Sequence, residues 1–229
     1  MAAVNEIISY PEMCSREGQN LQRGMNFSSI RGCSVILMSV QRNAPYRDRF
    51  EDGGSTLIYE GHDLPKGSDV GDPKQVDQPE RTASGKLTEN GKFLEAALAY
   101  KRKEGDARPV RVYEKIKQGI WSYNGLFRLV DAWKESDGTR ATFKFKLQAA
   151  FDDSELAVPE LDGRRRIIPS SVKIEVWRRD QGRCVLCGSA DELHFDHVLP
   201  YSKGGTSLKV ENVQLLCARH NLAKSDKIL

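Results

Sequence analysis

The 229-residue sequence lacks a run of about 18 apolar residues, the length that a membrane-spanning helix requires. It also lacks a basic N-terminal region followed by an apolar segment, so we expect a cytoplasmic, prokaryote-like protein with no membrane partner. Internal repeats are absent, and 19 glycines and nine prolines are too few for a collagen-like chain. With 39% hydrophobic and 29% charged residues, the composition is that of a globular protein of one or two domains.

Cysteine is scarce, and its distribution is uneven. Only five cysteines are present, and three of them lie in the last 46 residues. An odd number of cysteines crowded at one end is a poor disulfide framework. The pattern favours a metal site in a reducing compartment.

No excess of one charge dominates the chain, because the net charge is only +3. The charges are nevertheless segregated along the sequence. Residues 41–80 hold five basic and nine acidic side chains, whereas residues 81–148 hold 15 basic and eight acidic ones. This asymmetry predicts either a positive surface that binds a polyanion or an ordinary solvated surface of mixed charge.

Hydrophobic spacing predicts a mostly β region with one clear helix, at residues 89–103. The strands are expected at residues 34–40, 55–59, 110–113, 126–130 and 142–147. The last of them alternates strictly, which predicts apolar side chains inside and lysines outside. The pairs Asn124-Gly125 and Asp137-Gly138 predict hairpin turns.

We expect an α+β protein in four parts. They are an N-terminal extension at 1–20, a mostly β domain at 21–148, a linker at 149–170 and a small domain at 171–229. Ser171 is expected to cap the first helix of the small domain.

The small domain contains two pairs of metal-ligand residues. Cys184 and Cys187 have a two-residue gap, and so have Cys217 and His220. Four such side chains are typical of a closed, tetrahedral, structural Zn²⁺ site. Two correctly spaced pairs within about 60 residues are hard to explain as ordinary core residues, and in so small a module the metal would supply much of the folding energy.

Acidic, imidazole and amide groups lie between and after these pairs. Asp196 is a ligand suited to a hard divalent cation, and the adjacent His197 is suited to accept a proton from water. Asn221 follows a zinc ligand and offers a second oxygen to the cation. This set suits hydrolysis of a phosphodiester bond. The alternative is a zinc knuckle with incidental polar residues.

Residues 172–227 resemble the HNH endonuclease family, which has a ββα-metal fold. The resemblance implies that Asp196 and Asn221 bind the catalytic Mg²⁺ or Mn²⁺ and that His197 is the general base. It also implies that Asn212 orients the base and that Lys224 contacts phosphate. Many relatives have cysteine at the position of His220, and histidine is an equally competent zinc ligand.

The larger domain contains residues suited to bind one planar base. Tyr46 and Asp48 follow the first strong strand, and Tyr59 ends the next. Two aromatic rings supply stacking, and a carboxylate accepts a hydrogen bond from an exocyclic amine such as that of cytosine. Tyrosines at strand ends are usually packing residues, which is the alternative interpretation.

The order of segments over residues 21–148 resembles the SRA (SET and RING-associated) domain, a PUA-like β-barrel. The segments at 59–63 and 123–127 carry most of the resemblance. The family flips 5-methylcytosine or a related base out of the duplex. The resemblance implies that Tyr46 and Tyr59 sandwich this base and that Asp48 reads its Watson–Crick edge.

Together the two resemblances imply a modification-dependent restriction endonuclease that acts on double-stranded DNA containing 5-methylcytosine or 5-hydroxymethylcytosine. One HNH module makes one nick, so a double-strand break predicts a homodimer or two binding events. Two alternatives are a reader of modified DNA that does not cleave, and an HNH nickase that does not depend on modification.

Overall fold

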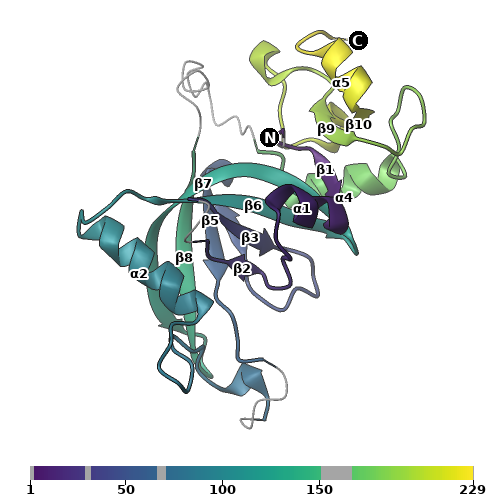
Figure 1. Ribbon diagram of the computed structural model, residues 1–229. Coiled ribbons are helices and arrows are strands. Elements are labelled where there is room, and N and C mark those ends of the chain that lie inside the picture. Colours follow the sequence, from purple (N-terminus) through teal and green to yellow (C-terminus); the bar gives the residue numbers. More distant parts are fainter. Residues whose placement is uncertain (1–2, 29–31, 66–70, 151–166, 229) are drawn as a thin grey trace.

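The computed structural model describes residues 3–28, 32–65, 71–150 and 167–228 (Figure 1). The predicted α+β class is confirmed. The first region consists of β1 (Ile7–Ser9), α1 (Tyr10–Glu17), β2 (Met25–Asn26), β3 (Ser34–Met38), β4 (Arg49–Glu51), β5 (Thr56–Glu60), α2 (Glu89–Lys101), β6 (Arg108–Lys117), β7 (Ile120–Ser136) and β8 (Ala141–Ala149). The second consists of α4 (Ser170–Arg179), β9 (Leu193–His197), β10 (Val213–Cys217) and α5 (Ala218–Lys224).

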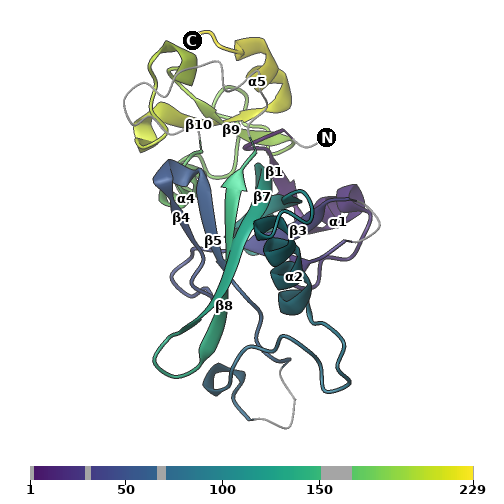
Figure 2. The same ribbon diagram turned by 90° about the vertical axis from the view of Figure 1, so that its left-hand side faces the viewer.

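The first region is built on one sheet in the order β2-β3-β6-β7-β8-β5-β4, with β1 added to β7. Strands β3 and β6 are parallel, and the other pairs are antiparallel. Its core contains Phe143, Phe145 and Leu147, which alternate along β8 and are fully buried. Helix α2 adds Phe93 and Ala97 to the same core, and Figure 2 shows it lying along β7 and β8.

One of the two predicted hairpin turns is confirmed and the other is wrong. Asp137-Gly138 joins β7 to β8, and Gly138 has the positive φ of 94° that such a turn requires. Asn124-Gly125 instead lies inside β7. Gly125 has a φ of 101°, and the register between β6 and β7 shifts at Val112/Tyr113, so this pair forms an irregularity in a long strand. The real turn is at Gly119, with a φ of 77°.

Two expectations about single residues are also wrong. Lys144 does not point into solvent but is buried with 3% exposure, because it pairs with Glu60. Ser171 is not the cap of the next helix, because α4 begins at Ser170 with Pro169 at the N-cap. The fixed φ of proline suits the start of a helix.

The second region is a ββα unit. Strands β9 and β10 pair antiparallel, with His197 opposite Val213 and Leu193 opposite Cys217, and α5 follows at once. It lies at one end of the large sheet, beside α4 and β1 (Figures 1 and 2). No helix in the described ranges is long and apolar enough to cross a membrane.

Candidate functional sites

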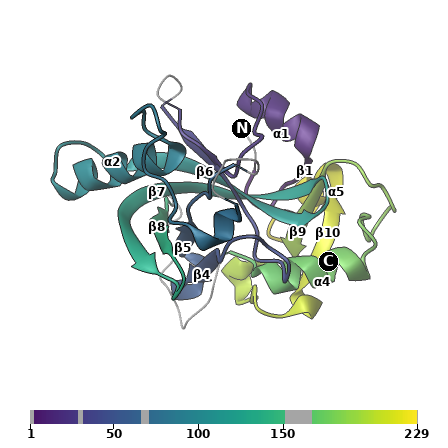
Figure 3. The same ribbon diagram turned by 90° about the horizontal axis from the view of Figure 1, so that it is seen from below.

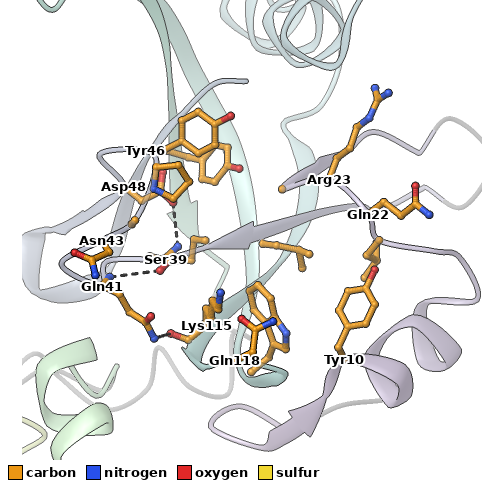
Figure 4. Close-up of a pocket in the computed structure, with 18 of the residues that line it drawn as sticks. Tyr10, Gln22, Arg23, Ser39, Gln41, Asn43, Tyr46, Asp48, Lys115 and Gln118 are labelled. Atoms are coloured by element: carbon orange, nitrogen blue, oxygen red, sulfur yellow. Dashed lines mark hydrogen bonds between the residues drawn. The ribbon is translucent and has the colours of Figure 1, made fainter. Parts of the chain in front are cut away.

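A cavity of about 550 Å³ opens between β3, β5, the turn joining β6 to β7, and the segment before β2. Tyr46, Asp48 and Tyr59 all line it, so the structure brings together the three residues predicted to bind a base. The polar side chains that Figure 4 labels, from Tyr10 to Gln118, surround the same space. Its volume is within the range of sites that hold a small planar group.

The Asp48 carboxylate is fixed by two backbone groups. Its Oδ2 accepts a hydrogen bond from Ser39 N at 3.1 Å (Figure 4), and its Oδ1 accepts one from Glu60 N at 3.1 Å. Burial raises the pKa of Asp48 to about 7, because desolvation outweighs these two hydrogen bonds. The carboxyl group therefore gains and loses a proton in the neutral range.

This titration predicts a pH-dependent stability. The pKa of the Asp48 carboxyl is higher in the folded state than in the unfolded state, where it is about 3.9. Folding therefore favours the protonated carboxyl, and the protein loses stability as pH rises between about 4 and 7. We expect the wild type to lose on the order of 2–4 kcal/mol relative to Asp48→Asn over this range. Thermal unfolding of both proteins from pH 4 to 8 measures the difference, and parallel pH profiles would contradict it.

The two tyrosines differ in accessibility. Tyr46 is half-buried, its hydroxyl accepts a hydrogen bond from Asp63 N at 3.4 Å, and Lys74 Nζ lies 4.3 Å from its ring centroid. Tyr59 is 1% exposed and belongs to the sheet core. A Cβ atom on Gly24 would lie only 2.5 Å from the Tyr59 hydroxyl, so Gly24 leaves the space that this hydroxyl occupies.

A buried network of ion pairs adjoins the cavity through Glu60. Lys144 Nζ lies 2.8 Å from Glu60 Oε2, and Arg140 Nη1 lies 2.7 Å from Asp63 Oδ1. Glu60 also supplies the backbone N–H that holds Asp48. Lys144 is buried because it neutralises Glu60. Sequence reasoning missed this network, since its members lie up to 84 residues apart and no local motif marks them.

The second site is the four-residue cluster of the ββα unit. The ligand atoms of Cys184, Cys187, Cys217 and His220 all lie within 4.8 Å of one another. Cys187 Sγ is 3.9 Å from Cys217 Sγ, and His220 Nδ1 is 3.3 Å from Cys217 Sγ. Tetrahedral Zn²⁺ with Zn–S bonds of about 2.3 Å places its ligand atoms about 3.5–3.8 Å apart. The cluster is therefore consistent with a structural zinc site.

The third site adjoins this cluster. Asp196 and His197 end β9, and α5, which carries Asn221 and Lys224, packs against β9. Asp196 Oδ2 lies 2.9 Å from Nζ of Lys224, which is 1% exposed. A carboxylate and an amide oxygen are the ligands that Mg²⁺ and Mn²⁺ prefer, so the donor set fits such a cation.

The ring of His197 is oriented by one hydrogen bond. Its Nε2 lies 2.8 Å from Ser207 Oγ. When Nε2 carries the hydrogen and donates it to Ser207, Nδ1 keeps the lone pair that accepts a proton. Burial lowers the pKa of His197, which favours the neutral ring.

The hydrogen bonds of the Asn212 side chain go to the loop that follows His197. Its Oδ1 accepts a hydrogen bond from Leu199 N at 2.8 Å, and its Nδ2 donates to Leu199 O at 3.2 Å and Thr206 O at 2.9 Å. The side chain thus ties both ends of this loop together. These bonds would let Asn212 act on His197 through the position of the loop.

Gly205 has no room for a side chain in this loop. A Cβ atom there would lie 1.8 Å from Leu199 O and 2.9 Å from Asn212 Nδ2. We expect Gly205→Ala to cost about 1–3 kcal/mol of unfolding free energy, because the loop must move away from the backbone carbonyl of Leu199. Denaturant unfolding measures the cost. Gly105→Ala is the control, since no described atom outside its immediate neighbours lies within 4 Å of a Cβ at Gly105. Equal stability of the two variants would contradict the prediction.

Models of two known domain families match the two parts of the chain. The SAD/SRA domain model matches residues 13–152, and the HNH endonuclease model matches residues 184–227. The first match covers more than half of the chain, which therefore belongs to the SAD/SRA domain family. The C-terminal part is an HNH endonuclease domain, so the predicted order of the two domains is confirmed.

Several solved structures are similar to the chain. The modification-dependent TagI restriction endonuclease is 20% identical, with 96% of this chain and 76% of that chain covered and a TM-score of 0.44. The SRA domain of SUVH5 in complex with hemimethylated CG DNA is 25% identical, with 70% and 94% covered and a TM-score of 0.46. The same domain bound to fully hydroxymethylated CG DNA is 22% identical, with 65% and 89% covered and a TM-score of 0.43. A comparison with curated proteins found no match.

Proposed function

We propose that this protein is a modification-dependent DNA endonuclease. Its SAD/SRA domain would take a flipped 5-methylcytosine or 5-hydroxymethylcytosine into the cavity, and its HNH domain would hydrolyse a phosphodiester bond nearby. The observation that carries the proposal is that one chain combines a cavity lined by Tyr46, Asp48 and Tyr59 with a nuclease domain that contains Asp196 and His197.

In the cavity, the half-buried Tyr46 would supply an accessible aromatic ring for a base, and Asp48 would supply the acceptor for its exocyclic amine. Tyr59 lies in the wall with 1% exposure, so stacking of the base on its ring would require the cavity to open there. Burial of one methyl carbon contributes only about 1 kcal/mol. Contact with the methyl group alone therefore discriminates weakly. The shape of the cavity and the cost of flipping must supply the rest.

In the nuclease site, His197 Nδ1 would take the proton from the attacking water while Ser207 holds Nε2. Asp196 and Asn221 would hold Mg²⁺ or Mn²⁺, which supplies charge stabilisation at the phosphate and the leaving oxygen. Lys224 is buried and pairs with Asp196 in this structure, so its ammonium group would contact phosphate only after leaving that pair. The Cys₃His cluster would hold Zn²⁺ and fix β9 and β10 against α5.

We also propose that a double-strand break requires a homodimer, because one HNH site cuts one strand at a time. A two-fold dimer would present two such sites to the two strands. Sedimentation with and without the modified duplex measures the state that binds.

The test is cleavage of one duplex in three forms: unmodified, 5-methylated and 5-hydroxymethylated at cytosine. Each form is incubated with Mg²⁺, Mn²⁺ or EDTA. Cleavage restricted to a modified form and abolished by EDTA is the expected result. Metal-dependent cleavage of all forms would remove the modification reader. Binding without cleavage would favour a reader that does not cut.

A further inference from the structure

Two consecutive residues belong to the hydrophobic cores of different domains. Ile167 packs in the core of the large sheet, where a Cβ atom on Gly54 would lie 3.0 Å from its own Cβ. Ile168 is fully buried in the core of the nuclease domain. The chain therefore passes from one core to the other without an exposed spacer at this point. Residues 151–166 of the predicted linker lie outside the described residues.

The turn that joins β6 to β7 contacts both the cavity of the large sheet and the hydrophobic core of the nuclease domain. On one side, Lys115, Gln118 and Trp121 line the cavity. On the other side, Ile116 and Ile120 pack into the nuclease core. Figure 3 shows the joined ends of β6 and β7 directed toward α4, β9 and β10. One short segment of chain thus supplies some of its side chains to the cavity and others to the core of the nuclease domain.

A fully buried polar set lies at this junction. Lys173 of α4 is 0% exposed, and its Nζ lies 3.3 Å from Glu114 Oε2 and 2.5 Å from Asn124 Oδ1. Asn124 Nδ2 donates to the same Glu114 oxygen at 3.0 Å. Glu114 and Asn124 belong to β6 and β7 and are 0% and 3% exposed. The set therefore joins the nuclease domain to the reader by directional hydrogen bonds.

The N-terminal segment forms another link across the junction. Asn5 N donates to Tyr123 O of β7 at 2.8 Å, and Phe195 N of β9 donates to Asn5 O at 3.1 Å. One residue thus bonds to a strand of each domain. These backbone hydrogen bonds and the buried polar set together define one orientation of the nuclease domain relative to the large sheet.

A buried ion pair contributes little net stability, because desolvation of both charges offsets their attraction. Apolar side chains of similar size would hold the two domains together at least as well, but they would allow sliding. The polar set instead favours one register of α4 on β6 and β7, since each hydrogen bond requires its partner at a defined distance and angle.

We propose that Lys173, Glu114 and Asn124 are positioning residues that dock the nuclease on the reader in a single orientation. The bond that is cut would then lie at a fixed number of nucleotides from the modified base in the cavity. The inference rests on the proposed function and deepens it, because it identifies what determines the distance between recognition and cleavage.

The test maps the cuts at nucleotide resolution on a long duplex with one modified cytosine. Lys173→Met leaves the Glu114 charge buried and unpaired, which could prevent folding. The decisive variant is therefore the double replacement Lys173→Met with Glu114→Gln, which removes both charges and keeps the volume. Arg178→Met is the matched control, since it removes an exposed positive charge from the same helix.

We expect the wild type and Arg178→Met to cut at one or two neighbouring bonds. In the double variant the fraction of cuts at the preferred bond should fall about threefold or more and spread over several bonds. Binding of the modified duplex should not change. Scattered cuts by the wild type, or the same narrow pattern in the double variant, would overturn the inference.

Hydrogen exchange distinguishes failure of this inference from failure of the proposed function. Amides of residues 116–120 should exchange faster in the double variant and at the wild-type rate in Arg178→Met, whether or not the protein cleaves DNA. Unchanged exchange in the double variant would overturn the positioning role. Absence of cleavage by the wild type, with faster exchange in the double variant, would count against the proposed function alone.

Discussion

Replacement of His197 by alanine should reduce cleavage of modified DNA by about 10²–10⁴-fold and leave binding of the same duplex unchanged. The size of the loss is that of a general base whose removal leaves the remaining charge stabilisation in place. Binding should persist because Tyr46, Asp48 and Tyr59 line a cavity in the other domain. Single-turnover cleavage and a gel-shift titration measure the two quantities.

His194→Ala is the matched control for this loss. It removes an imidazole from the same strand, β9, at a position that pairs with Leu216 and forms a bridge with Glu6. It therefore reports how much activity depends on the strand itself. A comparable loss in His194→Ala, or activity within about tenfold of wild type in His197→Ala, would remove His197 as the general base.

Loss of the zinc should unfold the ββα unit and leave the large sheet folded. Structural zinc contributes on the order of 10 kcal/mol to small domains, which exceeds the stability that so small a core provides. The sheet core contains none of the four ligands. After chelation, amides of β9 and β10 should exchange freely, and amides of β3 and β6 should stay protected.

Cys187→Ser tests the same dependence without a chelator. Cys187 is exposed, so its replacement removes a metal ligand and almost no packing. Burial raises the pKa of the Cys184 thiol, but hydrogen bonds from the backbone of Cys217 and Leu186 outweigh burial and lower this pKa to about 6. The lowered pKa favours the thiolate form that zinc requires. Cys14→Ser is the control, because Cys14 lies in α1, far from the cluster in sequence.

The outcome is read from metal content and exchange together. We expect about one zinc per chain in the wild type and in Cys14→Ser, and much less in Cys187→Ser. A fully protected β9–β10 pair in metal-free protein would contradict the structural role. Unfolding of both domains on chelation would show instead that the junction transmits the loss to the reader.

The Cys₃His cluster beside the candidate nuclease site could be predicted from the sequence because its ligands are set by short spacings. Cys184 and Cys187, like Cys217 and His220, form pairs whose two-residue gaps bring them to one metal in many folds. Asp196 and His197 are adjacent in the chain. Such local patterns fix which side chains meet, so the Cys₃His cluster and the ββα unit were expected and are found.

The features that could not be predicted depend on distant partners. Lys144 was expected in solvent because lysine usually is, but its partner Glu60 lies 84 residues away. Lys173 is likewise buried by Glu114, 59 residues before it. The Asn124-Gly125 pair has turn chemistry, yet pairing of β7 with β6 on both sides of it keeps the strand continuous. Tertiary structure overrides local preference in all three cases.

The bond between Asn5 and Phe195 has a consequence for the order in which the molecule is made. The segment that holds Asn5 and β1 is synthesised before both of its partners, since β7 follows more than 110 residues later and Phe195 of β9 follows 190 residues after Asn5. Because distant contacts form slowly, β1 stays unpaired until β7 has been made, and its contact with β9 comes later still. The contact between Asn5 and Phe195 can therefore form only after every strand of the SAD/SRA domain has been synthesised, so this link between the two domains is among the last to close.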